Sequence, residues 1–148
     1  MYNNFIFGIQ PVENMFLKEK TTGMYNNKVR LLQQESEWWK RQISFLQAEN
    51  TNLKNRLAEI AAHEIVKDLL ADVENFQHLF IREDEMIALT KKDVYDFDKW
   101  LANGYVSDNS SLSEITGRQR KLRNEIEILE QKFNKLKFEF TNYVAENF

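Results

Sequence analysis

The stretch from Val29 to Ile60, VRLLQQESEWWKRQISFLQAENTNLKNRLAEI, decides the fold of this chain. Two interleaved series of residues recur in it every seventh position. The first series occupies heptad position d and comprises Leu32, Trp39, Leu46, Leu53 and Ile60. The second occupies position a and comprises Val29, Ser36, Ile43, Asn50 and Leu57. Such a pattern is typical of helices that pack lengthwise on other helices, so it predicts a coiled coil.

The composition favours helices along the rest of the chain as well. Only four glycines and one proline occur in 148 residues. A chain of this length with many strands would need more turn-forming residues. We therefore expect an elongated all-α protein with two heptad regions joined by a shorter helical segment. Its helices should span roughly residues 27–82, 90–103 and 111–147.

Charge and cysteine content narrow the class of protein. The absence of cysteine excludes disulfides, thiolate metal sites and a cysteine nucleophile, and fits a reducing compartment. No apolar run approaches the roughly 20 residues that span a bilayer, and no basic residue precedes the apolar Phe5–Ile9 segment, so no secretory signal is expected. The net charge is −3, and residues 61–110 carry −6, which argues against nucleic-acid binding. We expect a cytoplasmic protein.

Asn50 points to a particular mode of assembly. It occupies an a position between apolar layers, where it can hydrogen-bond its symmetry mate in a parallel, in-register dimer. Such a dimer would also pair Glu35 with Lys40 and Glu49 with Lys54. We therefore expect a parallel homodimer through Val29–Ile60, with this interface: Leu32, Trp39, Ile43, Leu46, Asn50, Leu53, Leu57 and Ile60. The alternative is a helix of a globular bundle whose Asn50 faces water.

Trp39 fits a two-stranded coil poorly, because its bulk at a d position would strain the seam. Either the amino-terminal tail covers it, or the coil opens there into a larger bundle. Residues 1–26 are expected to form that tail, poorly structured or acting as a docking segment, with Asn26 or Asn27 capping the first helix.

The middle of the chain, residues 61–110, departs from the heptad. Glu64 and Lys67 fall on the expected seam, and the apolar residues from Ile65 to Phe80 form a wider stripe. We expect the first helix to end or bend between Arg82 and Leu89. A short helix then begins near Thr90, ends at Asn103-Gly104 and leads into a loop at 104–110.

A second heptad region opens at the capping box formed by Ser111 and Glu114 and fills residues 111–148. Its expected interface is Ile115, Leu122, Ile126, Leu129, Phe133, Leu136, Phe140 and Tyr143. A parallel pair of these helices would set Arg118 against Arg123, whereas an antiparallel pair would set Arg118 against Glu139. The charges therefore favour an antiparallel partner.

The two heptad regions thus prefer opposite orientations, and one straight two-fold axis cannot serve both. Either the last helix folds back on its own chain, for which residues 61–89 remain an open partner, or it joins parallel dimers into a tetramer or filament. Phenylalanine at a positions also favours an assembly thicker than a two-stranded coil.

Few residues suggest chemistry. Glu59 and His63, and again Glu74 and His78, lie four apart and share a helix face, but bundle di-metal sites use a Glu-x-x-His spacing. We therefore expect solvated polar pairs, and no metal or cofactor. Acidic residues gather at 83–85 and at Asp93, Asp96 and Asp98. They predict a solvated face, with a docking surface for a basic partner as the sharper alternative.

Together these patterns favour a non-enzymatic, self-associating scaffold or adaptor. It would dimerise through Val29–Ile60 and present its acidic and carboxy-terminal helices to an unidentified protein partner, without nucleic acid or membrane insertion. The first alternative is a structural subunit of a larger assembly of cytoskeletal, secretion or phage type. The second is a helical-bundle metalloprotein that uses the Glu/His pairs.

Overall fold

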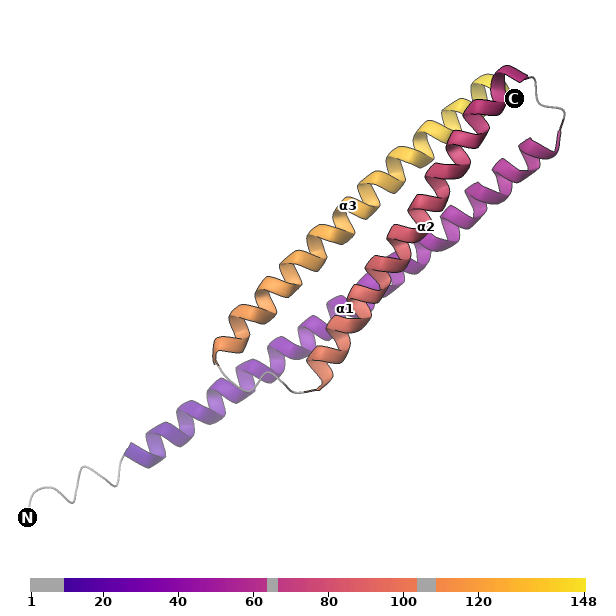
Figure 1. Cartoon of the computed structure of the whole chain (residues 1–148). Helices are drawn as coiled ribbons and strands as arrows, with labels where there is room; N and C mark the ends of the chain where they lie inside the picture. The colour runs from indigo at the N-terminus through magenta and orange to yellow at the C-terminus, as the bar shows by residue number, and fades with distance from the viewer. Residues whose placement is uncertain (1–9, 64–66, 104–108) are drawn as a thin grey trace, which may run out of the picture. The chain divides into compact units, whose positions relative to one another are not determined.

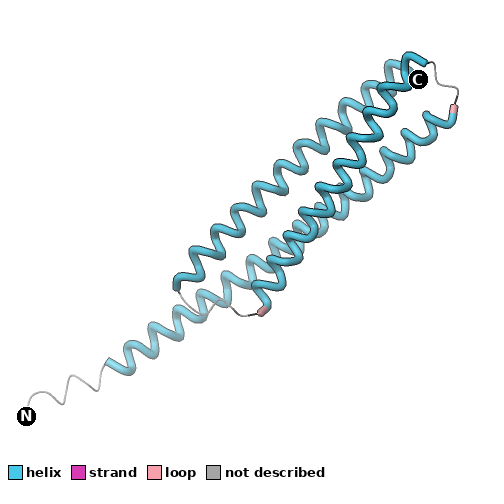
Figure 2. Tube along the Cα trace, viewed as in Figure 1, coloured by secondary structure: helices cyan, strands magenta, loops and turns pink. Residues whose placement is uncertain are grey.

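The computed structural model describes residues 10–63, 67–103 and 109–148. These residues form three helices: α1 (Gln10–Ala62), α2 (Lys67–Ala102) and α3 (Asn109–Asn147) (Figure 1). Figure 2 shows that the described residues contain no strand. The prediction of an all-α protein is therefore confirmed. None of the described helices is long and apolar enough to cross a membrane.

The chain divides into two compact units, residues 1–35 and residues 36–148. The described part of the first unit is the beginning of α1, which starts at Gln10 rather than near residue 27. Pro11 suits that start, because the first turn of a helix needs no backbone N–H donor. Asn26 and Asn27 consequently lie inside the helix and do not cap it. In this unit Met24 and Leu31 are exposed, whereas Leu32 is buried.

The second unit is a three-helix bundle built from residues 36–62 of α1 with α2 and α3. Lys40 pairs with Asp98, and Lys54 pairs with Asp84, so α1 and α2 run antiparallel. The aromatic ring of Phe76 lies 5.2 Å from that of Phe140, and α3 runs back along α2 (Figure 1).

Ion pairs between α1 and its two neighbouring helices fix the register of the bundle. Lys40 hydrogen-bonds Asp98 and Glu37, and these bonds raise the pKa of the Lys40 ammonium above its usual value. Because α2 runs antiparallel to both α1 and α3, α3 runs parallel to α1 (Figure 1), and Lys137 of α3 reaches Glu49 of α1 at 2.5 Å. The last helix therefore folds back on its own chain, which is one of the two arrangements that the sequence predicts for it.

Aromatic side chains fill the centre of the bundle. Phe80 and Phe140 are fully buried, with ring centroids 5.1 Å apart and rings nearly perpendicular, a favourable edge-to-face arrangement. Phe133 is also buried. The ring centroid of Trp39 lies 6.2 Å from that of Phe97, and the Trp39 side chain is only 4% exposed. A three-helix core has room for these rings at heptad positions, which a two-stranded coil lacks.

The structure corrects the expected break between Arg82 and Leu89, because α2 continues through it. The buried residues of α2 alternate in steps of three and four: Val73, Phe76, Phe80, Glu83, Ile87, Thr90, Val94, Phe97 and Leu101. This is a third heptad seam, hidden in the sequence by its two polar members. The Thr90 hydroxyl does not cap a new helix but donates to the carbonyl of Met86 at 2.9 Å. No glycine or proline interrupts residues 67–102.

The first helix instead ends at Ala62, not near residue 82. The His63 N–H donates to the carbonyl of Ile60 at 3.2 Å, which tightens the last turn. The chain therefore reverses between the end of α1 and the beginning of α2. That reversal allows α2 to cover the seam that α1 leaves apolar.

The carboxy-terminal helix lies close to its expected position. It begins at Asn109, just before the predicted cap at Ser111, whose side chain lies outside the described residues. Most of the expected loop at 104–110 also lies outside the described residues.

Candidate functional site

The residues expected to form the dimer interface are all buried in the single chain. They are Leu32, Trp39, Ile43, Leu46, Asn50, Leu53, Leu57 and Ile60. Within residues 36–148 the seam of α1 is covered by α2 and α3. Dimerisation through this seam stays a prediction, and it would require the bundle to open.

Asn50, which the sequence places against its counterpart in a second copy, makes hydrogen bonds within the bundle. Its Nδ2 donates to the backbone carbonyl of Phe80 at 3.0 Å and to Oδ1 of Asp84 at 2.7 Å. The other oxygen of Asp84 pairs with Lys54. Asn50 is fully buried, so the alternative of a bundle helix whose Asn50 faces water is wrong in that respect. Both amide donors of Asn50 are satisfied within the chain.

The interface expected on α3 is likewise turned inward. Ile115, Leu122, Ile126, Leu129, Phe133, Leu136 and Phe140 are buried, and Tyr143 is half-buried. Tyr143 lies 5.1 Å from Phe76 of α2, measured between ring centroids. Burial raises the pKa of its hydroxyl, and the charge of nearby Asp72 adds to the rise. Arg118 pairs with Glu114 on its own helix and stacks 4.1 Å over Trp100 of α2.

The two Glu/His pairs do not form a metal site in the described residues. Glu59 lies on α1, which ends before His63, and both side chains are exposed. Glu74 and His78 are exposed on α2. No group of three or more potential ligands gathers among the described residues.

The acidic residues of α2 have different surroundings: some pair with α1, one is buried, and others line a depression between α2 and α3. Asp84 and Asp98 bind lysines of α1. Glu83 is buried on the α2 seam rather than solvated. Asp93 and Asp96 line a shallow depression of about 190 Å³ beside Arg118 and Lys121 of α3. The expected solvated acidic face is therefore only partly present.

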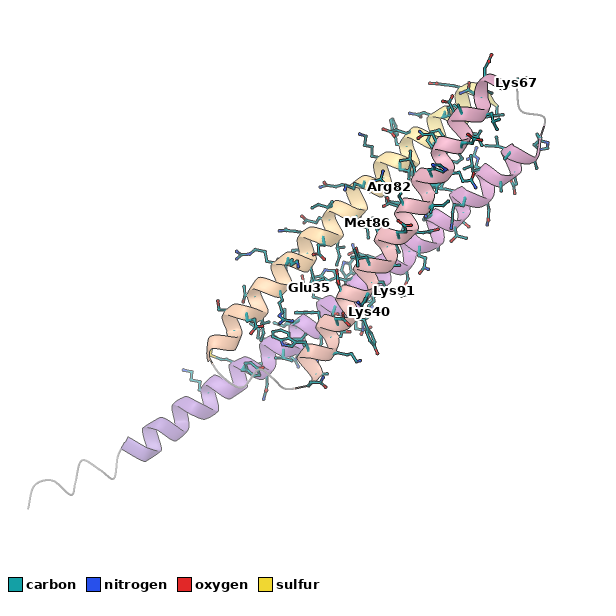
Figure 3. The ribbon with its side chains drawn as sticks, viewed as in Figure 1. Glu35, Lys40, Lys67, Arg82, Met86 and Lys91 are labelled. Carbon is teal, nitrogen blue, oxygen red and sulfur yellow. The ribbon has the colours of Figure 1, made fainter. Side chains whose placement is uncertain are left out.

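A groove of about 280 Å³ runs between α2 and α3, here named the α2–α3 groove. Its apolar lining residues are Met86, Leu89, Ile128 and Leu129, and its charged lining residues are Glu83, Asp93, Glu125 and Lys132. Met86, Leu89 and Ile128 are between 44% and 52% exposed, and because they line one groove they form a contiguous exposed apolar patch. Figure 3 labels Met86 along α2.

Two carboxyl groups in this groove hold a negative charge poorly. Burial raises the pKa of Glu83, and Asp84 adds to the rise, while the Lys132 ammonium opposes it. Burial also raises the pKa of Glu125. The Asp93 carboxylate raises it further through its charge and through a hydrogen bond, against the opposing charge of Lys121. A bound cation would stabilise the ionised form of both groups.

A second groove, of about 300 Å³, lies between α1 and α3 and is here named the α1–α3 groove. Trp38 and Phe45 border it and are 54% and 63% exposed. The Arg41 guanidinium lies 5.8 Å from the Trp38 ring. Leu46 and Ile126 also line the groove, with Glu130 and Asn134 at its polar side.

Neither groove is predicted by the heptad pattern, because that pattern assigns apolar residues to the seams only. A signal was present, because Trp38 and Phe45 are seven residues apart and lie outside both seams. Such spacing places them on one outer face of the helix. Comparison of the chain with protein-family models, with curated proteins and with solved structures gave no match.

Proposed function

We propose that this chain is a non-enzymatic adaptor that binds partner proteins through grooves on a three-helix bundle. The observation that carries the proposal is the pair of exposed aromatic residues, Trp38 and Phe45, at the border of the α1–α3 groove. Tryptophan and arginine are the residues most enriched among those that dominate binding energies at protein interfaces. Trp38 and Arg41 supply both at one site.

The interior of the bundle supports a binding role more than a catalytic one. Two of its buried polar residues have structural roles, since Asn50 joins α1 to α2 and Thr90 bonds a carbonyl of its own helix. The grooves are lined by apolar side chains with a few charged ones, a composition suited to holding a partner. A cytoplasmic location, expected from the absence of cysteine, belongs to the same proposal.

Self-association is the second candidate, as a dimer or as a subunit of a larger assembly. The two heptad regions favour it, although their seams lie inside the bundle within residues 36–148. Sedimentation of the purified chain over a hundredfold concentration range separates the candidates. A monomer throughout supports the adaptor, and growth to dimers or larger species supports self-association.

The adaptor proposal is tested by placing a photo-crosslinking phenylalanine analogue at position 45 or at position 138. Phe138 is the matched control, because it is 67% exposed on α3 and does not line the α1–α3 groove. In native extract we expect one discrete cross-linked protein from position 45 and none from position 138. The purified partner should then bind the wild type, and Phe45→Ser should weaken that binding at least tenfold while Phe138→Ser leaves it within twofold. Equal cross-linking from both positions would contradict the proposal.

A further inference from the structure

The α2–α3 groove is lined by apolar side chains and by more carboxyl groups than cationic groups. Glu83 and Asp93 of α2 and Glu125 of α3 line it, whereas Lys132 is its only lining cation among the described residues. Lys121 lies 3.9 Å from Glu125 but is 79% exposed and lies outside the groove lining. Carboxyl groups and apolar side chains therefore line the same groove.

Glu83 provides an independent indication of a ligand. Its side chain is buried, with 8% exposure, and it lines the groove. Its Oε1 has no hydrogen-bond partner within the described part of the chain. A buried carboxyl oxygen without a partner is costly, and rotation of the Glu83 side chain toward a donor bound in the groove would remove that cost.

The spacing of the carboxyl groups along the groove suits a helical ligand. Glu83 and Asp93 are ten residues apart on α2, which corresponds to about 15 Å along the helix axis. Met86 and Leu89 lie between them, and Ile128 lies on the opposite side of the groove. A helical ligand lying along the groove would present apolar side chains at its centre and a cation toward each end. Methionine beside aliphatic residues suits such docking, because its flexible side chain adapts to varied partners.

We propose that the α2–α3 groove binds a basic amphipathic helix of a partner protein. The apolar face of that helix packs on Met86, Leu89 and Ile128. One of its Lys or Arg side chains donates to Glu83, and a second binds between Asp93 and Glu125. This inference rests on the proposed adaptor function and adds to it a second site and the chemistry of its partner.

The probe is a capped 14-residue peptide of leucine and lysine, with leucines spaced for one helix face. A second peptide carries glutamate in place of each lysine. Affinity is measured by calorimetry at 150 mM salt on the full chain, and the site is mapped by backbone amide NMR. We expect the lysine peptide to bind, with shift changes centred on residues 83–93 and 125–132. The glutamate peptide should not bind.

Matched variants separate a built site from general attraction to an acidic protein. Asp93→Asn with Glu125→Gln should weaken the lysine peptide at least tenfold, whereas Asp68→Asn with Glu74→Gln, which removes the same charge from exposed positions of α2, should change it less than twofold. Leu89→Ser should weaken binding at least fivefold, whereas Ile81→Ser, at a similarly exposed position outside the groove, should not. Circular dichroism confirms that each variant remains helical.

Three results would overturn the inference: no binding of the lysine peptide up to 1 mM, equal loss in groove and control variants, or shift changes centred on the α1–α3 groove. Each of them leaves the cross-linking test at position 45 unaffected. Failure of this site with discrete cross-linking at position 45 would remove the basic helix and retain the adaptor. Failure at position 45 would remove the adaptor function itself.

Discussion

Asn50 of α1 donates a hydrogen bond of 2.7 Å from its Nδ2 to Oδ1 of Asp84 on α2. The same carboxylate pairs through Oδ2 with Lys54, one turn farther along α1. Asp84 thus holds two successive turns of α1 against α2. A side chain that could specify a dimer in a two-stranded coil here specifies which helix of its own chain α1 contacts and at what register.

Replacing Asp84 with Ala should lower the free energy of unfolding by about 1–3 kcal/mol, because it leaves a donor of the fully buried Asn50 without its partner. The measurement is urea unfolding followed by circular dichroism at pH 7. Glu85→Ala is the control, since the neighbouring Glu85 is exposed, and it should change stability by less than about 0.5 kcal/mol. Equal effects of the two changes would show that Asp84 does not join the helices.

Replacing Glu83 with Gln should stabilise the protein at pH 7 by about 1 kcal/mol, because it removes a charge that burial disfavours. Burial raises the pKa of Glu83 in the folded state above its value of 4.5 in the unfolded chain. The folded state therefore binds the proton more tightly, and this contribution to stability is fully present below about pH 4.5 and is lost as pH rises through the raised pKa.

The advantage of Glu83→Gln should accordingly grow from pH 4 to pH 7 in thermal unfolding experiments. Glu74→Gln, at an exposed position of the same helix, should show no such trend. A Glu83→Gln protein that is less stable than the wild type at pH 7 would mean that the ionised carboxylate is favoured by its surroundings, with Lys132 outweighing burial.

Replacing Phe80 with Ala should cost about 3–5 kcal/mol, because Phe80 is fully buried against Phe140 and its loss leaves a cavity at the centre of the bundle. Phe138→Ala makes the same chemical change at a side chain that is 67% exposed. It should change the free energy of unfolding by less than about 0.5 kcal/mol. Urea unfolding of both variants gives the comparison, and similar costs would place Phe80 outside the core.

Replacing Gly117 with Ala should stabilise the protein by about 0.5–1 kcal/mol, because glycine inside a helix loses more backbone freedom on folding than alanine does. Gly117 lies within α3, and an added Cβ would meet nothing within 4 Å. The expected result is a higher midpoint of thermal unfolding. A lower midpoint would indicate that α3 does not form a regular helix at this position.

Much of the fold could be predicted from periodicity, and the failures have identifiable causes. The heptads of α1 and α3 were visible because their seam residues are mostly apolar. The heptad of α2 was not, since Glu83 and Thr90 interrupt it, and only burial shows that both lie on the seam. The bulk of Phe133 at an a position favours a core thicker than two helices, and a larger bundle is one of the two alternatives that Trp39 leaves open.

The pairing of the helices was harder to predict than their positions. The charge pattern of the sequence matches Glu49 to Lys54 of a second copy, while folding back of the last helix on residues 61–89 stays an open alternative. In the bundle Glu49 binds Lys137 of α3, and Lys54 binds Asp84 of α2. Complementary charges are abundant on such helices and are individually weak, so they cannot distinguish an intrachain from an interchain partner. The grooves depend on that packing and could not be located before it was known.

The central claim is that α1 packs on α2 of the same chain, and one cross-linking measurement tests it most directly. The chain has no cysteine, so Lys40→Cys combined with Asp98→Cys provides two unique and partly exposed thiols. Because Lys54 and Asp84 themselves hold α1 to α2, the measurement is made on this second α1–α2 pair, which leaves Asn50, Lys54 and Asp84 intact. Equal amounts of ¹⁵N-labelled and unlabelled protein carrying these two changes are mixed, unfolded and refolded together, treated with a short bismaleimide, digested and analysed by mass spectrometry. If α1 packs on α2 of the same chain, the linked peptides containing positions 40 and 98 carry the label in both segments or in neither. Linked peptides that join one labelled and one unlabelled segment would show that α1 packs on a second copy, and would contradict the account.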